Sequence, residues 1–372
     1  MQKVYLYIEN GTYLEANSFG AAGTSIGEIV FNTSLTGYQE ITTDPSYAGQ
    51  FVTFTMPEIG IVGVNDNDSE HSKIYSKGII VRNYNEDHSN FRAEGSLSNL
   101  LKEQGIIGIC DIDTRYLTKM IRDEGAMMMI ASTEISSKEE LKSKLESSPR
   151  IEDINYIEEV STKEPYIHKN GAWNHENMSY NKAVMSDKKV VVIDFGVKRN
   201  ILNELVEAGL EVEVIPSNFK ADDLIAKFEA GEIGGIFLSN GPGDPLTLKN
   251  EKEQVQKLID KNIPMFAICL GHQMLSIAHG HDTFKLPFGQ HGGNHPVTSN
   301  AIVEITAQNH NYNVPDSIKT IAEVTHTNLF DNTIEGVKYN DKPIFSVQHH
   351  PEASPGPHES KYVFKEFAEM IK

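Results

Sequence analysis

Residues 262–280, NIPMFAICLGHQMLSIAHG, contain the segment that decides the fold. The apolar run at residues 263–268 predicts a buried strand of the kind found in parallel sheets. Cys269 and Gly271 follow at once and indicate a sharp turn. From residue 273 the apolar residues have helical spacing, and Gly280 ends the pattern because glycine tolerates the positive φ of a helix C-terminus. We therefore expect a helix over residues 273–278 and place Cys269 at a strand-to-helix elbow.

A cysteine at such an elbow is well placed for nucleophilic chemistry. It projects from the carboxyl edge of a sheet, where the positive end of the following helix favours a thiolate. The backbone N–H of Leu270, directly after Cys269, can stabilise the oxyanion of a tetrahedral intermediate. The alternative is a buried structural cysteine, since free cysteines are among the most buried residues. A catalytic role requires a base elsewhere in the chain.

Length, charge and cysteine content exclude several classes of function. The 372 residues suffice for two domains, each with its own core. The 52 acidic and 33 basic residues leave a formal charge of −19, which disfavours nucleic acid and anionic membranes as partners. Two distant cysteines predict no disulfide framework, and no apolar run approaches the roughly 18 residues of a membrane span. The first residues lack the pattern of a signal peptide, so we expect a cytoplasmic protein.

Residues 1–150 predict a β-rich domain that also contains helices. Alternating residues on both sides of Asn10-Gly11 indicate a hairpin, and more strands are expected up to residue 55. Capping residues and apolar spacing predict helices over residues 96–104, 113–125 and 137–146. The polar residues 151–188 follow and are expected to form a linker or an extended crossing segment between domains.

No catalytic pattern occurs in this first half. Cys110 follows an apolar run without an elbow glycine, so it is predicted to be a core residue. Ser46 lies in the sequence Asp-Pro-Ser-Tyr, where serine is ordinarily a turn residue.

Residues 189–372 predict an α/β domain with a parallel sheet. Strands are expected at residues 189–194, 212–215, 235–238 and 263–268, and helices between them at 199–208, 221–229 and 251–261. Ligands of such sheets bind beyond the carboxyl ends of the strands.

One glycine-rich loop lies at that edge. Residues 239–245, SNGPGDP, follow the third strand, and Gly241 and Gly243 let the backbone approach a substrate and offer a second N–H for an oxyanion. The alternative is an ordinary turn. Neither G-x-x-x-x-G-K-[ST] nor G-x-G-x-x-G occurs in the chain, so there is no local sign of nucleotide binding.

The missing base is offered by residues 343–352, PIFSVQHHPE. A strand is expected over residues 344–348, and in extended backbone His350 and Glu352 face the same side. A carboxylate there can hold one nitrogen of the imidazole while the other takes the proton of a thiol. This predicts a Cys-His-acid triad, although a single histidine is more often structural. His349 faces the opposite way and is not expected to be the base.

Four other histidines are grouped in sequence, which raises the possibility of a metal site: His279, His281, His291 and His295. The HGGNH segment contains two glycines and does not predict the helix that an i, i+4 zinc pair requires. We therefore expect no metal in this chain and assign these histidines to loops and interfaces.

Three of these segments together resemble the class I, triad-type glutamine amidotransferases: SNGPGDP, ICLGHQ and HHPEASPGPHE. The resemblance covers residues 189–372 and implies a flavodoxin-like fold. It implies that Cys269 is the nucleophile, His350 the base and acid, and Glu352 the residue that orients the histidine. By the same resemblance Gly243 and Leu270 supply the oxyanion N–H groups. The residues that help to hold L-glutamine are then Gly241, Gly243, Leu270, Gln273, Asn309, Asn311 and Tyr312.

Four further segments resemble the small-subunit family of carbamoyl-phosphate synthase: NTSLTGYQEITTDPSYAGQFV, GICDIDTRYLTKMIRDEGAM, DFGVKRNIL and FGQHGGNHPV. The first two lie in the half that other amidotransferases lack. The resemblance implies a β-rich N-terminal domain, with Ser46 reaching the glutamine across the domain junction. It also implies a heterodimer in which a large subunit binds ATP and a divalent cation, while this chain carries no cofactor. The product, carbamoyl phosphate, would serve arginine and pyrimidine biosynthesis.

Two positions depart from the family pattern. Ala267 stands where elbows often have glycine, and Asn311-Tyr312 replaces the usual Gly-Phe. Alanine is small enough for a tight elbow, and asparagine tolerates positive φ better than most residues.

Two other interpretations remain. One is a different cysteine amidase or a γ-glutamyl hydrolase on the same fold, which would turn over glutamyl substrates without a partner. The other is a non-catalytic regulatory subunit, which would ordinarily have lost Cys269 or His350.

Overall fold

The computed structural model describes residues 1–183, 185–299 and 301–372. The chain divides into two compact units. Unit 1 comprises Met1–Tyr156 with Pro287–Gly292, and unit 2 comprises Ile157–Leu286 with Gly293–Lys372.

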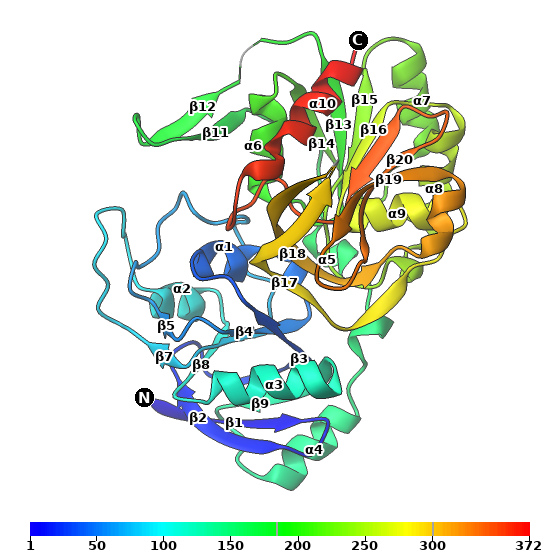
Figure 1. The fold of residues 1–372 in the computed structure, drawn as a ribbon. Helices are drawn as coiled ribbons and strands as arrows, with labels where there is room; N and C mark the ends of the chain where they lie inside the picture. The colour runs from blue at the N-terminus through cyan, green and yellow to red at the C-terminus, as the bar shows by residue number, and fades with distance from the viewer. Residues whose placement is uncertain (184, 300) are drawn as a thin grey trace. The chain divides into compact units, whose positions relative to one another are not determined.

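Unit 1 is built on a closed barrel with the strand order β1-β2-β8-β6-β4-β3-β9 (Figure 1). The barrel strands are β1 (Gln2–Ile8), β2 (Tyr13–Ser18), β3 (Thr24–Asn32), β4 (Gln50–Phe54), β6 (Gly78–Ile80), β8 (Ile107–Cys110) and β9 (Met127–Ser132). A separate pair joins β5 (Glu58–Ile59) to β7 (Asn83–Tyr84). The helices are α1 (Tyr38–Thr43), α2 (Leu97–Glu103), α3 (Thr114–Glu124) and α4 (Lys138–Glu146), with the short 3-10 helices η1 (Pro45–Tyr47) and η2 (Ile151–Asp153).

The expected hairpin and the three expected helices of this half are confirmed. In α3 the side chain of Asp113 accepts a hydrogen bond from the N–H of Tyr116, while Leu117 and Ile121 are buried. Gly125, at φ 95°, ends the helix. Helix α1 was not predicted, because its sequence, YQEITT, lies within a stretch whose residues favour strands.

Unit 2 contains a ten-stranded sheet with the order β10-β14-β13-β15-β16-β21-β20-β19-β17-β18. The parallel strands are β13 (Lys189–Asp194), β14 (Glu211–Pro216), β15 (Gly235–Leu238), β16 (Met265–Ile268) and β21 (Ile344–Val347). Numbered along the chain, their order is 2-1-3-4-5, the flavodoxin-like order. The predicted α/β fold of this half is therefore confirmed.

Helices cover both faces of this sheet, and Figure 1 shows α7, α8 and α9 on one side and α6 and α10 on the other. The helices are α5 (Ile157–Val160), α6 (Arg199–Glu207), α7 (Ala221–Glu229), α8 (Lys249–Asp260), α9 (Leu270–Ala278) and α10 (Tyr362–Met370), with η3 (Pro245–Thr247), η4 (Asp316–Thr320) and η5 (Glu359–Lys361). Successive strand residues enter opposite cores, as Phe237 and Leu238 do, because side chains alternate along a strand.

Strands that the sequence did not reveal extend the sheet at both edges. They are β10 (Tyr166–His168), β17 (Phe284–Ser299), β18 (Ile302–Asn313), β19 (Ala322–Asn328) and β20 (Ile334–Tyr339). Strand β20 pairs antiparallel with β21 and with β19, so the parallel sheet continues as an antiparallel one.

The unit boundaries differ from the expected ones at residues 151–188. Unit 2 already begins at Ile157, and β10 pairs antiparallel with β14. The strands β11 (Asn170–Asn174) and β12 (Ser179–Lys182) form a further hairpin, while residue 184 lies outside the described residues. The segment thus contains strands instead of forming a plain linker: β10 pairs with the ten-stranded sheet, while β11 and β12 pair with each other.

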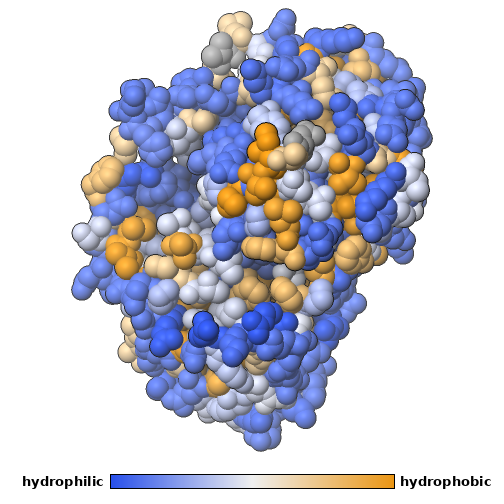
Figure 2. Space-filling view, viewed as in Figure 1, coloured by the Kyte–Doolittle hydropathy of each residue, from blue (hydrophilic) through white to orange (hydrophobic). Residues whose placement is uncertain are grey.

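Hydrophilic residues cover most of the face seen in Figure 2, where apolar residues occur in small groups. In the part of the chain that the structure describes, no helix is both long enough and apolar enough to cross a membrane.

Candidate active site

Cys269 lies between strand β16 and helix α9 at the carboxyl edge of the parallel sheet. Its backbone has φ 53° and ψ −107°, a conformation that non-glycine residues rarely adopt. Helix α9 begins at Leu270, three residues earlier than predicted, so the first N–H groups of the helix lie directly after the cysteine. The expected elbow is confirmed, and its unusual backbone is typical of a nucleophile turn.

The base and the acid come from the segment after β21, which pairs in parallel with β16. The backbone N–H of Cys269 donates to the carbonyl oxygen of Val347 at 2.9 Å, which holds the two strand ends together. His350 donates from Nδ1 to Oε1 of Glu352 at 2.7 Å. All three side chains are at most 2% exposed. The structure therefore brings Cys269, His350 and Glu352 together in one buried site.

The charges of this site are coupled. Burial alone would lower the pKa of His350, but Glu352 and Cys269 outweigh burial and raise it to about 10. No hydrogen bond of ordinary geometry joins Nε2 of His350 to a partner in the described residues, which leaves this nitrogen for proton transfer.

Lys198 is the charged partner that the sequence did not reveal. It is 3% exposed, and its ammonium donates to Oε1 of Glu352 at 2.9 Å and to the carbonyl oxygen of Ala353 at 2.5 Å. Burial alone would raise the pKa of Glu352, but Lys198 and His350 outweigh burial and lower it to about 2. Glu352 is therefore a carboxylate at neutral pH and can hold His350 in one orientation. The sequence offered only one sign of this role: Lys198 follows closely after β13, at the edge of the sheet where the site was expected.

Comparison with known proteins identifies both halves of the chain. Residues 6–131 match the family described as carbamoyl-phosphate synthase small chain, CPSase domain, and residues 191–370 match glutamine amidotransferase class-I. The chain is 60% identical over 372 residues to the carbamoyl phosphate synthase small chain of Helicobacter hepaticus, with 100% of this chain and 98% of that protein covered. The chain belongs to the carbamoyl phosphate synthase small chain family.

Other members of the carbamoyl phosphate synthase small chain family are similar over the same length. The protein of that name from Campylobacter jejuni is 58% identical over 371 residues, covering 99% of this chain and 100% of its own. That from Synechococcus sp. is 44% identical over 373 residues, covering 100% of this chain and 94% of its own. The predicted family and enzyme class, a glutamine amidotransferase, are confirmed.

Several predicted glutamine-binding residues of the amidotransferase domain lie around Cys269. The thiol donates to the carbonyl oxygen of Asn309 at 3.5 Å. Gln273, on α9, donates from Nε2 to the carbonyl oxygen of Tyr312 at 2.8 Å. Asn309, Asn311 and Tyr312 all belong to β18, so this strand passes beside the elbow. Their roles in binding glutamine remain predictions.

The glycine loop after β15 lies against the same elbow. A Cβ on Gly241 would come within 2.8 Å of Cδ2 of Leu270 and 2.2 Å of the carbonyl oxygen of Phe195, so only glycine fits there. Gly243 has φ 89° and open space around it. The loop is thus packed at one glycine and open at the other, which fits the predicted approach of a substrate to Gly243.

Ser46 is the one predicted glutamine-binding residue in unit 1. It lies in η1, is 8% exposed, and its N–H donates to Oδ1 of Asp44 at 2.9 Å. Asp44 therefore caps the turn, and Ser46 lies within it, as the sequence predicted. Its predicted approach to the substrate remains a prediction.

The four histidines considered for metal binding have separate contacts. His279 stacks on Tyr339 with ring centroids 4.3 Å apart, and His281 contacts Oγ of Ser317 at 2.8 Å. His295 packs its ring edge against Phe330, whereas His291 lies in unit 1. No three His, Cys, Asp or Glu side chains among the described residues are placed to hold a metal ion.

Gly271 provides a first testable prediction about the elbow. An added Cβ would lie 2.3 Å from the carbonyl oxygen of Leu238, so Gly271→Ala must displace α9 from β15. We expect the free energy of unfolding to fall by about 1–3 kcal/mol. We also expect kcat for glutamine hydrolysis to fall about 100-fold, because a small displacement of reacting groups is costly. Urea unfolding and steady-state kinetics measure both.

Gly95→Ala is the control for this prediction. The added Cβ would meet only Cγ2 of Val64, at 3.8 Å, which is ordinary van der Waals contact. Its stability and kcat should equal those of the wild type. Wild-type kcat in Gly271→Ala would show that the close approach of α9 to β15 does not position the nucleophile.

Proposed function

We propose that this chain is the glutaminase subunit of a glutamine-hydrolysing carbamoyl-phosphate synthase. The observation that carries the proposal is the short bond between His350 and Glu352, 2.7 Å, in the same buried site as a cysteine at a nucleophile elbow. Membership of the small chain family supports the same function.

The proposed reaction uses Cys269 as nucleophile. Its sulfur attacks the side-chain amide carbon of L-glutamine, and the N–H groups of Leu270 and Gly243 stabilise the negative oxygen that forms. His350 takes up the thiol proton and delivers it to the departing nitrogen, so that ammonia leaves and a γ-glutamyl thioester remains. Water, deprotonated by His350, then hydrolyses the thioester to glutamate and restores the thiol. Glu352 keeps the imidazole oriented in both steps.

The remaining glutamine contacts are assigned by family resemblance. Gln273, Asn309, Asn311 and Tyr312 hold the substrate in the amidotransferase domain, together with Gly241, and Ser46 adds a contact from unit 1. The bound glutamine would replace the carbonyl group of Asn309 as the neighbour of the thiol, because the substrate amide and this carbonyl must both approach the sulfur of Cys269.

The partner in this proposal is the large subunit implied by the name "small chain" of the relatives. The large subunit would receive the ammonia and use ATP, a divalent cation and bicarbonate to make carbamoyl phosphate for arginine and pyrimidine biosynthesis. The expected cytoplasmic location likewise stays a prediction.

The test is to reconstitute the chain with the large subunit and to supply ATP, Mg²⁺ and bicarbonate with either nitrogen donor. We expect carbamoyl phosphate from glutamine only when this chain is present, and from ammonia with or without it. Rapid hydrolysis of glutamyl substrates by the chain alone, without glutamine-dependent synthesis in the complex, would instead identify a free-standing hydrolase.

A further inference from the structure

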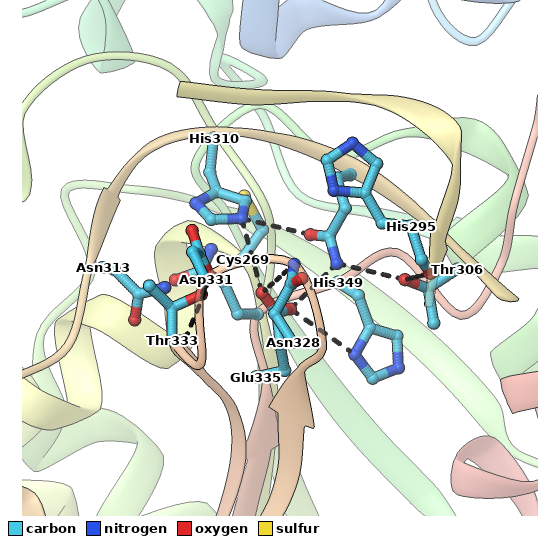
Figure 3. A network of polar contacts seen from close by, with 12 residues as sticks. Cys269, His295, Thr306, His310, Asn313, Asn328, Asp331, Thr333, Glu335 and His349 are labelled. Carbon is cyan, nitrogen blue, oxygen red and sulfur yellow. Dashed lines mark hydrogen bonds and ion pairs between the residues drawn. The ribbon is translucent and has the colours of Figure 1, made fainter. Parts of the chain in front are cut away.

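A buried carboxyl group, Glu335, lies behind the active site and has no role in the reaction described above. It belongs to β20 and is 0% exposed. Its Oε2 accepts a hydrogen bond from Nε2 of Gln308 at 2.9 Å, and its Oε1 accepts one from Nδ2 of Asn328 at 3.4 Å (Figure 3). One side chain therefore ties together β18, β19 and β20.

Gln308 is the link between Glu335 and the reacting groups. The carbonyl oxygen of Ala307, the preceding residue, accepts the N–H of His350 at 2.8 Å. The carbonyl oxygen of Asn309, the following residue, accepts the thiol of Cys269 at 3.5 Å. The backbone on both sides of Gln308 thus touches the predicted base and the predicted nucleophile, while its side chain is held by Glu335.

Glu335 also contacts the segment that carries the base. Its backbone carbonyl oxygen accepts the N–H of Gln348 at 2.8 Å. His349, fully buried next to His350, has Nδ1 3.9 Å from Oε2 of Glu335, and neither of its ring nitrogens forms a hydrogen bond within the described residues. Burial lowers the pKa of His349 well below its ordinary value, so a neutral ring lies beside the carboxyl group of Glu335.

The surroundings of Glu335 favour its uncharged form. Burial raises its pKa to about 8, although the hydrogen bonds from Gln308 and Asn328 lower this pKa. Asp331 raises it further and His350 lowers it, while Nε2 of His310 lies 3.9 Å from Oε1. A carboxylate in this place would be a buried charge without a close cationic partner among the described residues, which is costly.

We propose that Glu335 is a positioning residue: its carboxyl group holds the Gln308 side chain, and this keeps the β18 backbone against the Cys269 thiol and the backbone N–H of His350. The inference rests on the proposed glutaminase function. Without this carboxyl group β18 loses its tie to β20, and the backbone on both sides of Gln308 can shift away from the two groups.

The test compares Glu335→Gln with Glu335→Leu in the complete complex, using the steady-state kinetics of glutamine hydrolysis. Glu335→Leu removes both acceptor oxygens and leaves the Gln308 side chain with Thr306 and His310, so it should lower kcat about 100-fold, with a smaller change in KM. Glu335→Gln keeps one oxygen that can accept from Gln308 and should lower kcat only about 10-fold.

Three results would overturn the inference. They are wild-type kcat in Glu335→Leu, a Glu335→Leu defect that appears only in KM, or a Glu335→Gln defect as large as that of Glu335→Leu. If Glu335→Leu does not fold, the kcat of Glu335→Gln decides alone, and wild-type kcat in that variant overturns the inference. Ammonia-driven synthesis, which bypasses this site, should be unchanged in both variants. Cys269→Ser tests the proposed function separately. If this variant retains glutamine hydrolysis, the proposed function fails, whatever the two Glu335 variants show.

Discussion

Replacing Cys269 by serine is expected to reduce glutamine hydrolysis by a factor on the order of 10⁴ or more, the size of effect seen when a catalytic nucleophile is removed. A serine hydroxyl occupies nearly the same volume, so the elbow with φ 53° should be retained. The hydroxyl is far less acidic than a thiol, and His350 cannot hold it as an anion. In the complete complex, glutamine-driven formation of carbamoyl phosphate should vanish while ammonia-driven formation survives.

Cys110→Ser is the matched control for this variant. Cys110 is also buried, and burial together with Asp111 raises its pKa to about 12, so it is an unreactive thiol. Its replacement should leave both nitrogen sources in use. Loss of both activities in Cys269→Ser, or loss of neither, would remove Cys269 from its assigned role.

Lys198→Met is expected to lower the free energy of unfolding by about 3–5 kcal/mol, because it leaves the Glu352 carboxylate buried with one partner fewer. The effect should depend on pH. The pKa of Glu352, lowered from 4.5 to about 2 in the folded protein, stabilises the wild type above pH 4.5. This stabilisation is lost as the pH falls from about 4.5 to about 2, so the difference between variant and wild type should shrink over that range. Urea unfolding midpoints at several pH values measure it.

Lys189→Met provides the comparison for Lys198→Met. Lys189 also pairs with a glutamate, Glu211 at 3.2 Å, but the two side chains are 50% and 39% exposed. An exposed pair contributes only about 0–1 kcal/mol, so this variant should unfold close to the wild-type midpoint. Equal effects of the two lysine variants would show that the pair of Lys198 and Glu352 is not a stabilising buried contact.

The elbow and the predicted triad could be read from the sequence because each depends on local backbone geometry. A strand followed by a helix places Cys269 at the sheet edge, and an extended HPE segment puts His350 and Glu352 on one side. Neither inference needs a contact between distant residues. Only the meeting of the two segments required the parallel pairing of β16 with β21, which the expected α/β fold supplies.

The buried charged and polar residues around the site could not be predicted in the same way. Lys198 is 154 positions from Glu352, and Gln308 is 27 positions from Glu335. No local pattern marks a buried charge whose partner is so distant. The antiparallel strands were missed because their residues do not alternate simply: β20 has only one exposed residue, and β17 contains glycines and two prolines. The sequence thus predicted the groups proposed to react, while the residues that hold them needed the fold.

The most direct measurement is to trap the covalent intermediate. The complete complex is supplied with glutamine, stopped with acid during turnover, digested, and analysed by mass spectrometry. We predict a γ-glutamyl group on the peptide that contains Cys269, no such group on Cys110, and none on either in the absence of glutamine. Turnover without any γ-glutamyl group on Cys269, or with the group on another residue, would contradict a thioester mechanism at this elbow.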